Sequence, residues 1–297
     1  MRRGVGERTP MRKVMKCKNI WAVYFTPTGT TKQVVTAMAN AAADAMQLPV
    51  NHWDITLPKP RREGKQFGES DLVIVGTPVY AGRVPNVILK ELALLQGCDT
   101  LAVPVVCYGN RNFDDGLIEL RDILETGGFR TVAAAAFVCE HSFSRTLAAG
   151  RPDDRDLQKA WTFGWKLGYQ AETLRQKWED EGRWPVPPIQ VPGTPKPYRG
   201  YYQPRDRKGV FIDIRKVKPL TSDQCDGCGI CAAVCPMGSI DPDDVQNFTG
   251  ICIKCGACIK KCPKEAKYYD DPGYLYHKEE LEAGLTRRAE PETFFHF

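Results

Sequence analysis

The sequence lacks any long apolar run, which limits where the protein can lie. No stretch approaches the roughly 20 consecutive apolar residues that a membrane-spanning helix needs. The N-terminal residues are basic but lack the apolar segment of a signal peptide. We therefore expect no membrane span and a cytoplasmic protein.

The body of the chain also lacks a basic excess, although the formal net charge is +5. Residues 1–18 contain seven Lys or Arg and one Glu, a net +6, which leaves about −1 for all other residues. This distribution favours a disordered leader, or an over-extended start with initiation at Met11 or Met15, over a polyanion-binding arm. We expect no nucleic-acid partner.

A G-x-G-x-x-G loop is missing as well, so the chain has no standard dinucleotide-binding motif. Any nicotinamide would have to act through a separate reductase or directly on another bound cofactor.

Cysteine, in contrast, is concentrated near the C-terminus in two copies of one pattern. Each copy is Cys-x2-Cys-x2-Cys-x3-Cys-Pro, at residues 225–236 and 252–263. Three thiolates in one tight loop can bind a 4Fe-4S cluster, and the fourth cysteine, before a helix-breaking proline, serves the other cluster. The spacing therefore predicts two 4Fe-4S clusters. The first is expected on Cys225, Cys228, Cys231 and Cys262, and the second on Cys252, Cys255, Cys258 and Cys235.

Zinc and disulfides are the weaker interpretations of these cysteines. Zinc sites are typically built from separated Cys-x2-Cys pairs, and disulfides need an oxidising compartment, which nothing in the sequence indicates. Gly227, Gly229 and Gly256 allow backbone amides to approach inorganic sulfur. Residues 217–270 resemble a bacterial two-cluster ferredoxin.

The N-terminal half alternates short apolar runs with helical patterns. The pattern predicts an α/β domain with a doubly wound five-stranded parallel sheet, whose ligand lies beyond the C-terminal strand ends. For the last helix, Pro152 and Asp153 are the start signal and Gly182 the stop. The expected strands are 20–25, 50–55, 72–76, 101–108 and 132–138, and the expected helices are 32–46, 85–95, 115–126 and 153–180.

A hydroxyl-rich loop, Thr-Pro-Thr-Gly-Thr-Thr at 26–31, joins the first strand to the first helix. Free backbone N–H groups, the helix dipole and several hydroxyls converge there, so we expect a phosphate. The loop resembles the phosphate loop of flavodoxins, and the whole of residues 19–270 resembles the flavodoxin-ferredoxin fusion family.

This resemblance implies FMN as a cofactor. Tyr80 is expected to stack on the flavin ring, with Tyr108 or Phe113 on the other face and backbone groups of Gly109 and Asn110 at its polar edge. The full set of expected FMN-binding residues is Thr26, Thr28, Gly29, Thr30, Thr31, Thr77, Pro78, Tyr80, Gly82, Tyr108, Gly109, Asn110, Arg111 and Phe113.

Some residues near this site have two interpretations. Flavodoxins surround the flavin with acidic residues, whereas Arg83 and Arg111 stand in these loops, and we expect Arg111 near the ring edge. His141 could donate a hydrogen bond to the flavin, but a loop histidine that caps backbone groups is the preferred interpretation. Cys107 and Cys139 could form a redox pair, but small buried side chains are favoured.

The predicted organisation separates two cofactor domains by a proline-rich linker. The linker either lies along the surface, pinned by its tyrosines, or crosses to a second subunit, so a homodimer stays open. The predicted segments are 1–18 as a tail, 19–182 as the FMN domain, 183–216 as the linker, 217–270 as the ferredoxin domain and 271–297 as a C-terminal tail.

Together these features predict an electron-transfer protein. FMN would exchange electrons with two 4Fe-4S clusters, linking two-electron and one-electron redox partner proteins. The alternative is an FMN-dependent reductase of a small acceptor such as a quinone, nitro compound or activated alkene, fed by the clusters. Room over the flavin would favour the reductase, and a flavin covered by the ferredoxin domain would favour the relay.

Overall fold

A computed structural model of the chain describes residues 16–296. The predicted N-terminal tail and the alternative start positions therefore lie almost entirely outside the described residues. Cys17, at the beginning of the described part, is buried against the core of the first domain.

Five parallel strands form the centre of the first domain. Their order across the sheet is β2-β1-β4-β6-β8, which is 2-1-3-4-5 when these five are counted along the chain. This is the flavodoxin-like order, so the predicted fold class is confirmed. The strands are β1 (Asn19–Tyr24), β2 (Val50–Asp54), β4 (Asp71–Pro78), β6 (Thr100–Tyr108) and β8 (Ala133–Val138).

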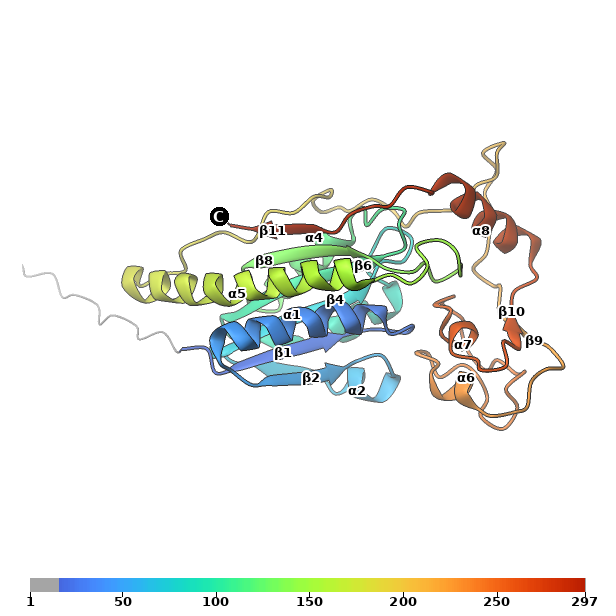
Figure 1. Cartoon of the computed structure of the whole chain (residues 1–297), viewed down its shortest axis with the longest axis horizontal. Coiled ribbons are helices and arrows are strands. Elements are labelled where there is room, and N and C mark those ends of the chain that lie inside the picture. Colours follow the sequence, from blue (N-terminus) through green and yellow to red (C-terminus); the bar gives the residue numbers. More distant parts are fainter. Residues whose placement is uncertain (1–15, 297) are drawn as a thin grey trace, which may run out of the picture.

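Further short strands extend this arrangement beyond the prediction. β7 (Phe129–Thr131) pairs with β6, and β11 (Glu292–Phe295) adds an antiparallel edge to β8. β3 (Lys65–Phe67) and β5 (Leu95–Gly97) form a separate parallel pair. Because β11 comes from the segment predicted only as a C-terminal tail, the end of the chain returns to the first domain (Figure 1).

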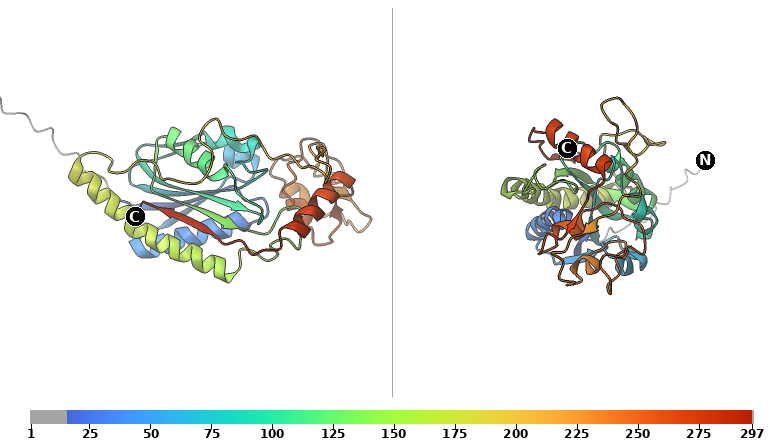
Figure 2. Two further views of the ribbon diagram at one scale, coloured as in Figure 1. Left: turned by 90° about the horizontal axis from the view of Figure 1, so that it is seen from above. Right: turned by 90° about the vertical axis from the view of Figure 1, so that its right-hand side faces the viewer.

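Helices cover both faces of the sheet, as Figure 2 shows from above. Alternate side chains of β1 point to opposite faces, with Ile20 and Ala22 in one apolar core and Val23 in the other. On the first face lie α1 (Thr30–Met46) and α5 (Asp154–Glu181), and on the second lie η1 (Asn86–Ile88), α3 (Leu89–Leu92) and α4 (Gly116–Thr126). The single helix expected at 85–95 is thus two short ones.

The ends of α5 are those that the sequence predicts. Asp153 accepts a hydrogen bond from the backbone N–H of Asp156 in a capping box, and Gly182 ends the helix with a φ of 65°.

The ferredoxin domain lies beyond the C-terminal ends of the parallel strands (Figure 1). Its elements are short: β9 (Leu220–Thr221), α6 (Ile230–Ala233), α7 (Ala257–Lys260) and β10 (Lys267–Tyr268). The helix α8 (Pro272–Gly284) follows the domain and leads back to β11. From the first domain, α2 (Pro58–Arg62) faces the ferredoxin domain. No helix among the described residues is long and apolar enough to cross a membrane.

The proline-rich linker lies along the surface of the first domain, the first of its two predicted courses. The Tyr198 hydroxyl donates to Asp122 at 2.7 Å, and the Tyr201 hydroxyl donates to the Val84 carbonyl at 2.9 Å. The Arg83 guanidinium stacks on both rings and forms two hydrogen bonds with Glu119. Arg83 therefore holds the linker.

Close contact between α1 and α5 gives a prediction for stability. A Cβ at Gly164 would lie 2.1 Å from the backbone oxygen of Met38, which cannot move without shifting α1. We expect Gly164→Ala to lower the free energy of unfolding by about 1–3 kcal/mol in urea denaturation. Gly284→Ala is the matched control, because that Cβ would meet nothing within 4 Å. Equal stability of the two variants would contradict this packing.

Candidate functional site

The loop between β1 and α1 is built to bind an anion. Gly29 precedes the helix with a φ of 99° and provides no side-chain cap, so the N–H groups of Thr30 and Thr31, the first two residues of α1, remain available. The hydroxyls of Thr28 and Thr30 lie 3.4 Å apart at this helix end. Thr26 is buried and accepts a hydrogen bond from the Lys32 N–H at 3.1 Å, which fixes the loop.

This loop opens into a cavity at the C-terminal ends of β1, β4, β6 and β8, which we call the strand-end cavity. Its position is the one where doubly wound sheets bind ligands. Threonines of the loop line one part, and Tyr80 and Tyr108 line another. The complete lining is Pro27, Thr28, Thr30, Thr31, Pro78, Val79, Tyr80, Cys107, Tyr108, Gly109, Cys139, Glu140, His141, Ser142 and Cys255.

Tyr80 reaches the cavity because a tight turn follows it. Its N–H and carbonyl pair with those of Arg83 at 2.9 and 3.1 Å, and Ala81 and Gly82 both have positive φ. A Cβ at Gly82 would lie 2.3 Å from the Asp114 carboxylate, so the turn needs glycine there. Burial, together with nearby Cys255 and Cys252, raises the pKa of Tyr80 well above its usual value.

Several residues predicted to bind FMN do not line the cavity. These are Thr26, Gly29, Thr77, Gly82, Asn110, Arg111 and Phe113. Thr26, Gly29 and Gly82 shape the loops as described above. Thr77 is fully buried, and Phe113 packs on Tyr108 with ring centroids 5.5 Å apart.

Arg111 and Asn110 contact other parts of the chain. The Arg111 guanidinium forms an ion pair with Asp114 and lies 4.6 Å from the centre of the Tyr202 ring in the linker. The Asn110 amide donates to the carbonyls of Leu285 and Arg287 at 2.9 and 2.7 Å. Asn110 thus fixes the segment that follows α8, and no sequence motif indicates this contact.

The eight motif cysteines surround two separate cavities in the ferredoxin domain. One is lined by Cys225, Cys228, Cys231 and Cys262, and the other by Cys235, Cys252, Cys255 and Cys258. The fourth cysteine of each motif thus lies with the other motif, which is the exchange that the sequence predicts. Within the described residues, no three Cys, His, Asp or Glu side chains converge as a single metal ion would require.

The buried cysteines must lose their protons to bind a metal centre, and burial opposes that loss. Burial raises the pKa of the Cys255 thiol to about 12 and also raises that of Cys258. Only a bound metal centre would hold such thiols as thiolates at neutral pH. The side chain of Tyr269, which also lines the second cavity, has its hydroxyl 3.7 Å from the Cys252 sulfur.

Two buried cations join the ferredoxin domain to the sheet domain. The Arg61 guanidinium, from α2, donates to the carbonyls of Thr56 and Pro236, both at 2.7 Å. The Lys260 ammonium, from α7, donates to the Glu140 carboxylate and to carbonyls of the loop after β8. Pro236 is directly after Cys235, and Lys260 is two residues after Cys258. Both cysteines line the second cysteine cavity, so both contacts lie beside it.

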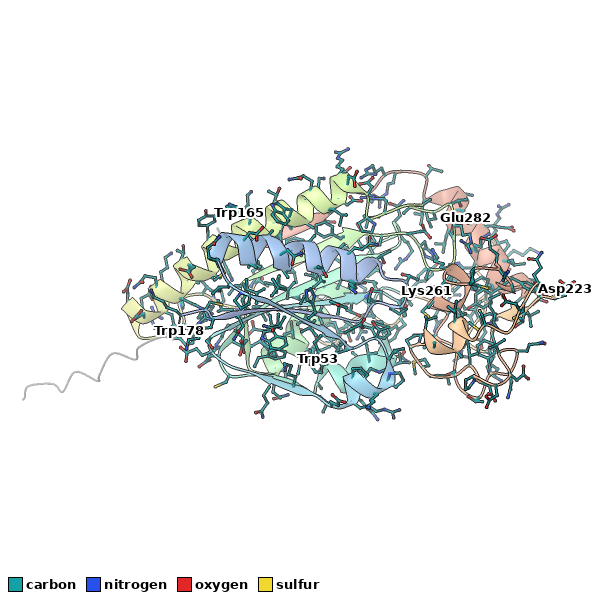
Figure 3. The ribbon with its side chains drawn as sticks, turned by 60° about the horizontal axis from the view of Figure 1, so that its bottom comes forward. Trp53, Trp165, Trp178, Asp223, Lys261 and Glu282 are labelled. Carbon is teal, nitrogen blue, oxygen red and sulfur yellow. The ribbon has the colours of Figure 1, made fainter. Side chains whose placement is uncertain are left out.

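The second cysteine cavity therefore faces the sheet domain, and the beginning of the first motif lies farther away. In Figure 3, Asp223, just before the first motif, is at the far end of the molecule, whereas Lys261 lies nearer the sheet. Cys255 lines both the second cysteine cavity and the strand-end cavity. One side chain thus adjoins both spaces.

The residues with two interpretations, Cys107, Cys139 and His141, all line the strand-end cavity. The other two cysteines outside the motifs do not line it: Cys98 is exposed and Cys17 is buried in the core of the first domain.

Comparison with known proteins identifies the C-terminal domain. Residues 224–267 match a family model described as a 4Fe-4S dicluster domain. Over 61 residues the chain is 36% identical to pyruvate synthase subunit PorD of Methanothermobacter marburgensis. The matched region covers 20% of this chain and 74% of that protein.

Solved flavodoxin structures resemble the other half of the chain. An archaeal flavodoxin is 15% identical with a TM-score of 0.37, covering 52% of this chain and 99% of its own. The flavodoxin of Streptococcus pneumoniae TIGR4 is 18% identical with a TM-score of 0.36, covering 51% and 99%. The strand order 2-1-3-4-5 identifies this half of the chain as flavodoxin-like in fold.

The C-terminal domain therefore defines an iron-sulfur electron-transfer protein of the ferredoxin class. Because the flavodoxin-like sheet precedes it in the same polypeptide, the chain belongs to the flavodoxin-ferredoxin fusion family.

The crossed arrangement of the cysteines gives a second prediction. We expect Cys235→Ala, although in the first motif, to lose the same cluster signals as Cys255→Ala and to retain about half of the iron. Electron paramagnetic resonance of the reduced proteins and iron analysis would measure this. Cys98→Ala, outside both cavities, is the control. If Cys235→Ala instead matched Cys231→Ala, the cysteines would not be exchanged between the motifs.

Proposed function

We propose that residues 19–182 bind one FMN in the strand-end cavity. The available N–H groups of α1 and the hydroxyls of Thr28 and Thr30 suit the phosphate, and Tyr80 and Tyr108 suit the ring. The flavodoxin-like strand order supports this choice, since FMN binds at the switch point of that fold.

We also propose that residues 217–270 bind two 4Fe-4S clusters, one in each cysteine cavity. The grouping of four cysteines around each cavity and the dicluster family match support this count. FMN supplies one- or two-electron chemistry when bound, and each cluster supplies one-electron chemistry.

The proposed function is an internal relay of electrons between FMN and the clusters. The observation that carries this proposal is that Cys255 lines both the second cysteine cavity and the strand-end cavity. Two cofactors that share one lining side chain can exchange electrons without a diffusing carrier.

Reduction of a small acceptor is less well supported. A Cβ at Gly256 would lie 2.4 Å from the Ser142 carbonyl oxygen, so the ferredoxin domain packs directly on the loop beside the cavity. Together with Cys255, this contact brings the ferredoxin domain to the cavity, where it would restrict the approach of an acceptor to the flavin. A covered flavin favours the relay over the reductase.

We propose that partner proteins exchange electrons at the first cluster. Cys228 of the first motif is exposed, and Asp223, just before that motif, lies at the far end of the molecule (Figure 3). Redox partner proteins could therefore approach this cluster while the second remains enclosed. The twelve free cysteines agree with a reducing compartment such as the cytoplasm.

Cofactor analysis of the anaerobically reconstituted protein tests the proposal. We expect about eight iron, eight sulfide and one FMN per chain, as two cubane clusters and one flavin site require. Zinc in place of iron, or FAD in place of FMN, would contradict it.

Two variants of the phosphate loop test the flavin site separately. Thr28→Ala removes a hydroxyl, and Gly29→Val forces a β-branched residue into a φ of 99°, so the valine should weaken FMN binding more. We expect about a tenfold or greater loss of affinity with unchanged iron content. Thr162→Ala, exposed on α5, is the control. Wild-type FMN affinity in both loop variants would show that FMN does not bind at this loop.

A further inference from the structure

His141 packs directly on the backbone at the end of β6. It follows β8 and lines the strand-end cavity beside Gly109. A Cβ at Gly109 would lie 2.3 Å from the His141 Cδ2 atom, so the imidazole can occupy this place only because residue 109 is glycine. The ring also meets Phe143 edge-on, with centroids 5.2 Å apart. The orientation of the imidazole is therefore fixed.

The hydrogen bonds of this ring determine which nitrogen carries its proton. Nδ1 accepts a hydrogen bond from the Phe143 N–H at 3.1 Å, so the neutral ring has its hydrogen on Nε2. Nε2 has no hydrogen-bond partner among the described residues.

The surroundings keep His141 neutral. Burial, followed by the positive charges of Lys260, His277 and Arg111, lowers its pKa to about 4, and Glu282 opposes this shift only weakly. The preceding residue, Glu140, is paired with Lys260. His141 is thus a neutral N–H donor beside the cavity.

Lys260 of the ferredoxin domain holds the backbone of this residue. Its ammonium donates to the His141 carbonyl at 2.7 Å and to the Ser144 carbonyl at 2.8 Å, and it pairs with the Glu140 carboxylate. The loop that carries His141 is therefore fixed from the second cysteine motif.

We propose that His141 is an FMN-binding residue whose Nε2–H donates a hydrogen bond to the flavin, and that Lys260 positions it. This rests on the proposed FMN site in the strand-end cavity. The flavin site is then completed by the ferredoxin domain, and the domain contact and FMN affinity are coupled.

The FMN dissociation constant of the cluster-loaded protein, measured by flavin fluorescence, tests this proposal. His141→Phe removes the donor, and Lys260→Met removes the residue that holds the loop. We expect each to weaken FMN binding about tenfold, and His141→Gln, which keeps an N–H donor, to lose less. Lys261→Met is the matched control, since this neighbouring lysine is exposed. Iron content should stay unchanged in all four.

The double variant separates positioning from a general loosening of the fold. If Lys260 acts through His141, the double variant should bind FMN about as well as either single variant. Both single variants should also lower the flavin midpoint potential, because a hydrogen-bond donor favours the electron-rich reduced ring.

Distinct results would overturn the inference or the proposed function. If both His141→Phe and His141→Gln bound FMN with wild-type affinity, His141 would not be an FMN-binding residue. Multiplied losses in the double variant, or a loss in Lys261→Met equal to that in Lys260→Met, would remove the positioning role of Lys260. Absence of FMN binding by the wild-type protein would instead overturn the proposed function.

Discussion

The arrangement of both cofactor sites depends on two buried cations at the domain contact. Arg61 and Lys260 are buried or nearly so, and unpaired charges in such positions would be costly. Across the domain contact, Arg61 donates to the Pro236 carbonyl, and Lys260 donates to the His141 and Ser144 carbonyls. Hydrogen bonds to a charged group contribute about 1.5–3 kcal/mol each. These contacts hold the residues around the second cysteine cavity against the sheet domain, and Cys255 lines both that cavity and the strand-end cavity.

The charges of the second motif therefore have an internal role that the sequence does not reveal. Charged side chains in a short loop are usually solvated at the surface. Instead, the Lys254 ammonium donates to the carbonyls of Arg215 and Cys252 at 2.8 Å, and Lys260 reaches the loop after β8. Lys267 is also buried and donates to the Thr221 hydroxyl at 2.6 Å.

The elements with strong local signals could be predicted from the sequence. Four of the five central strands, β1, β4, β6 and β8, contain continuous apolar runs, and the capping box of α5 is a local motif. The fold class follows from the alternation of strands and helices. The short strand β11 could not be predicted, because its four residues are stabilised by pairing with β8 and by contact between Phe295 and Phe163. The assignment of individual cysteines to clusters stays a prediction, which the two cavities support.

The proposed flavin site was predictable in its loops but less so in its side chains. A strand-to-helix loop rich in threonine has a recognisable sequence, whereas the direction of a long side chain depends on tertiary partners. Arg111 was expected at the ring edge, but its guanidinium lies between Asp114 and Tyr202. Lys260 shapes the same site from a distant part of the sequence.

The rate of electron transfer after a light pulse tests the central claim most directly. In the anaerobic, fully loaded protein, photoreduction of the flavin should be followed by loss of the reduced-flavin absorbance and matching bleaching of the clusters. An internal relay predicts a first-order rate that is independent of protein concentration. A rate that rises in proportion to protein concentration, or no transfer to the clusters, would contradict the account.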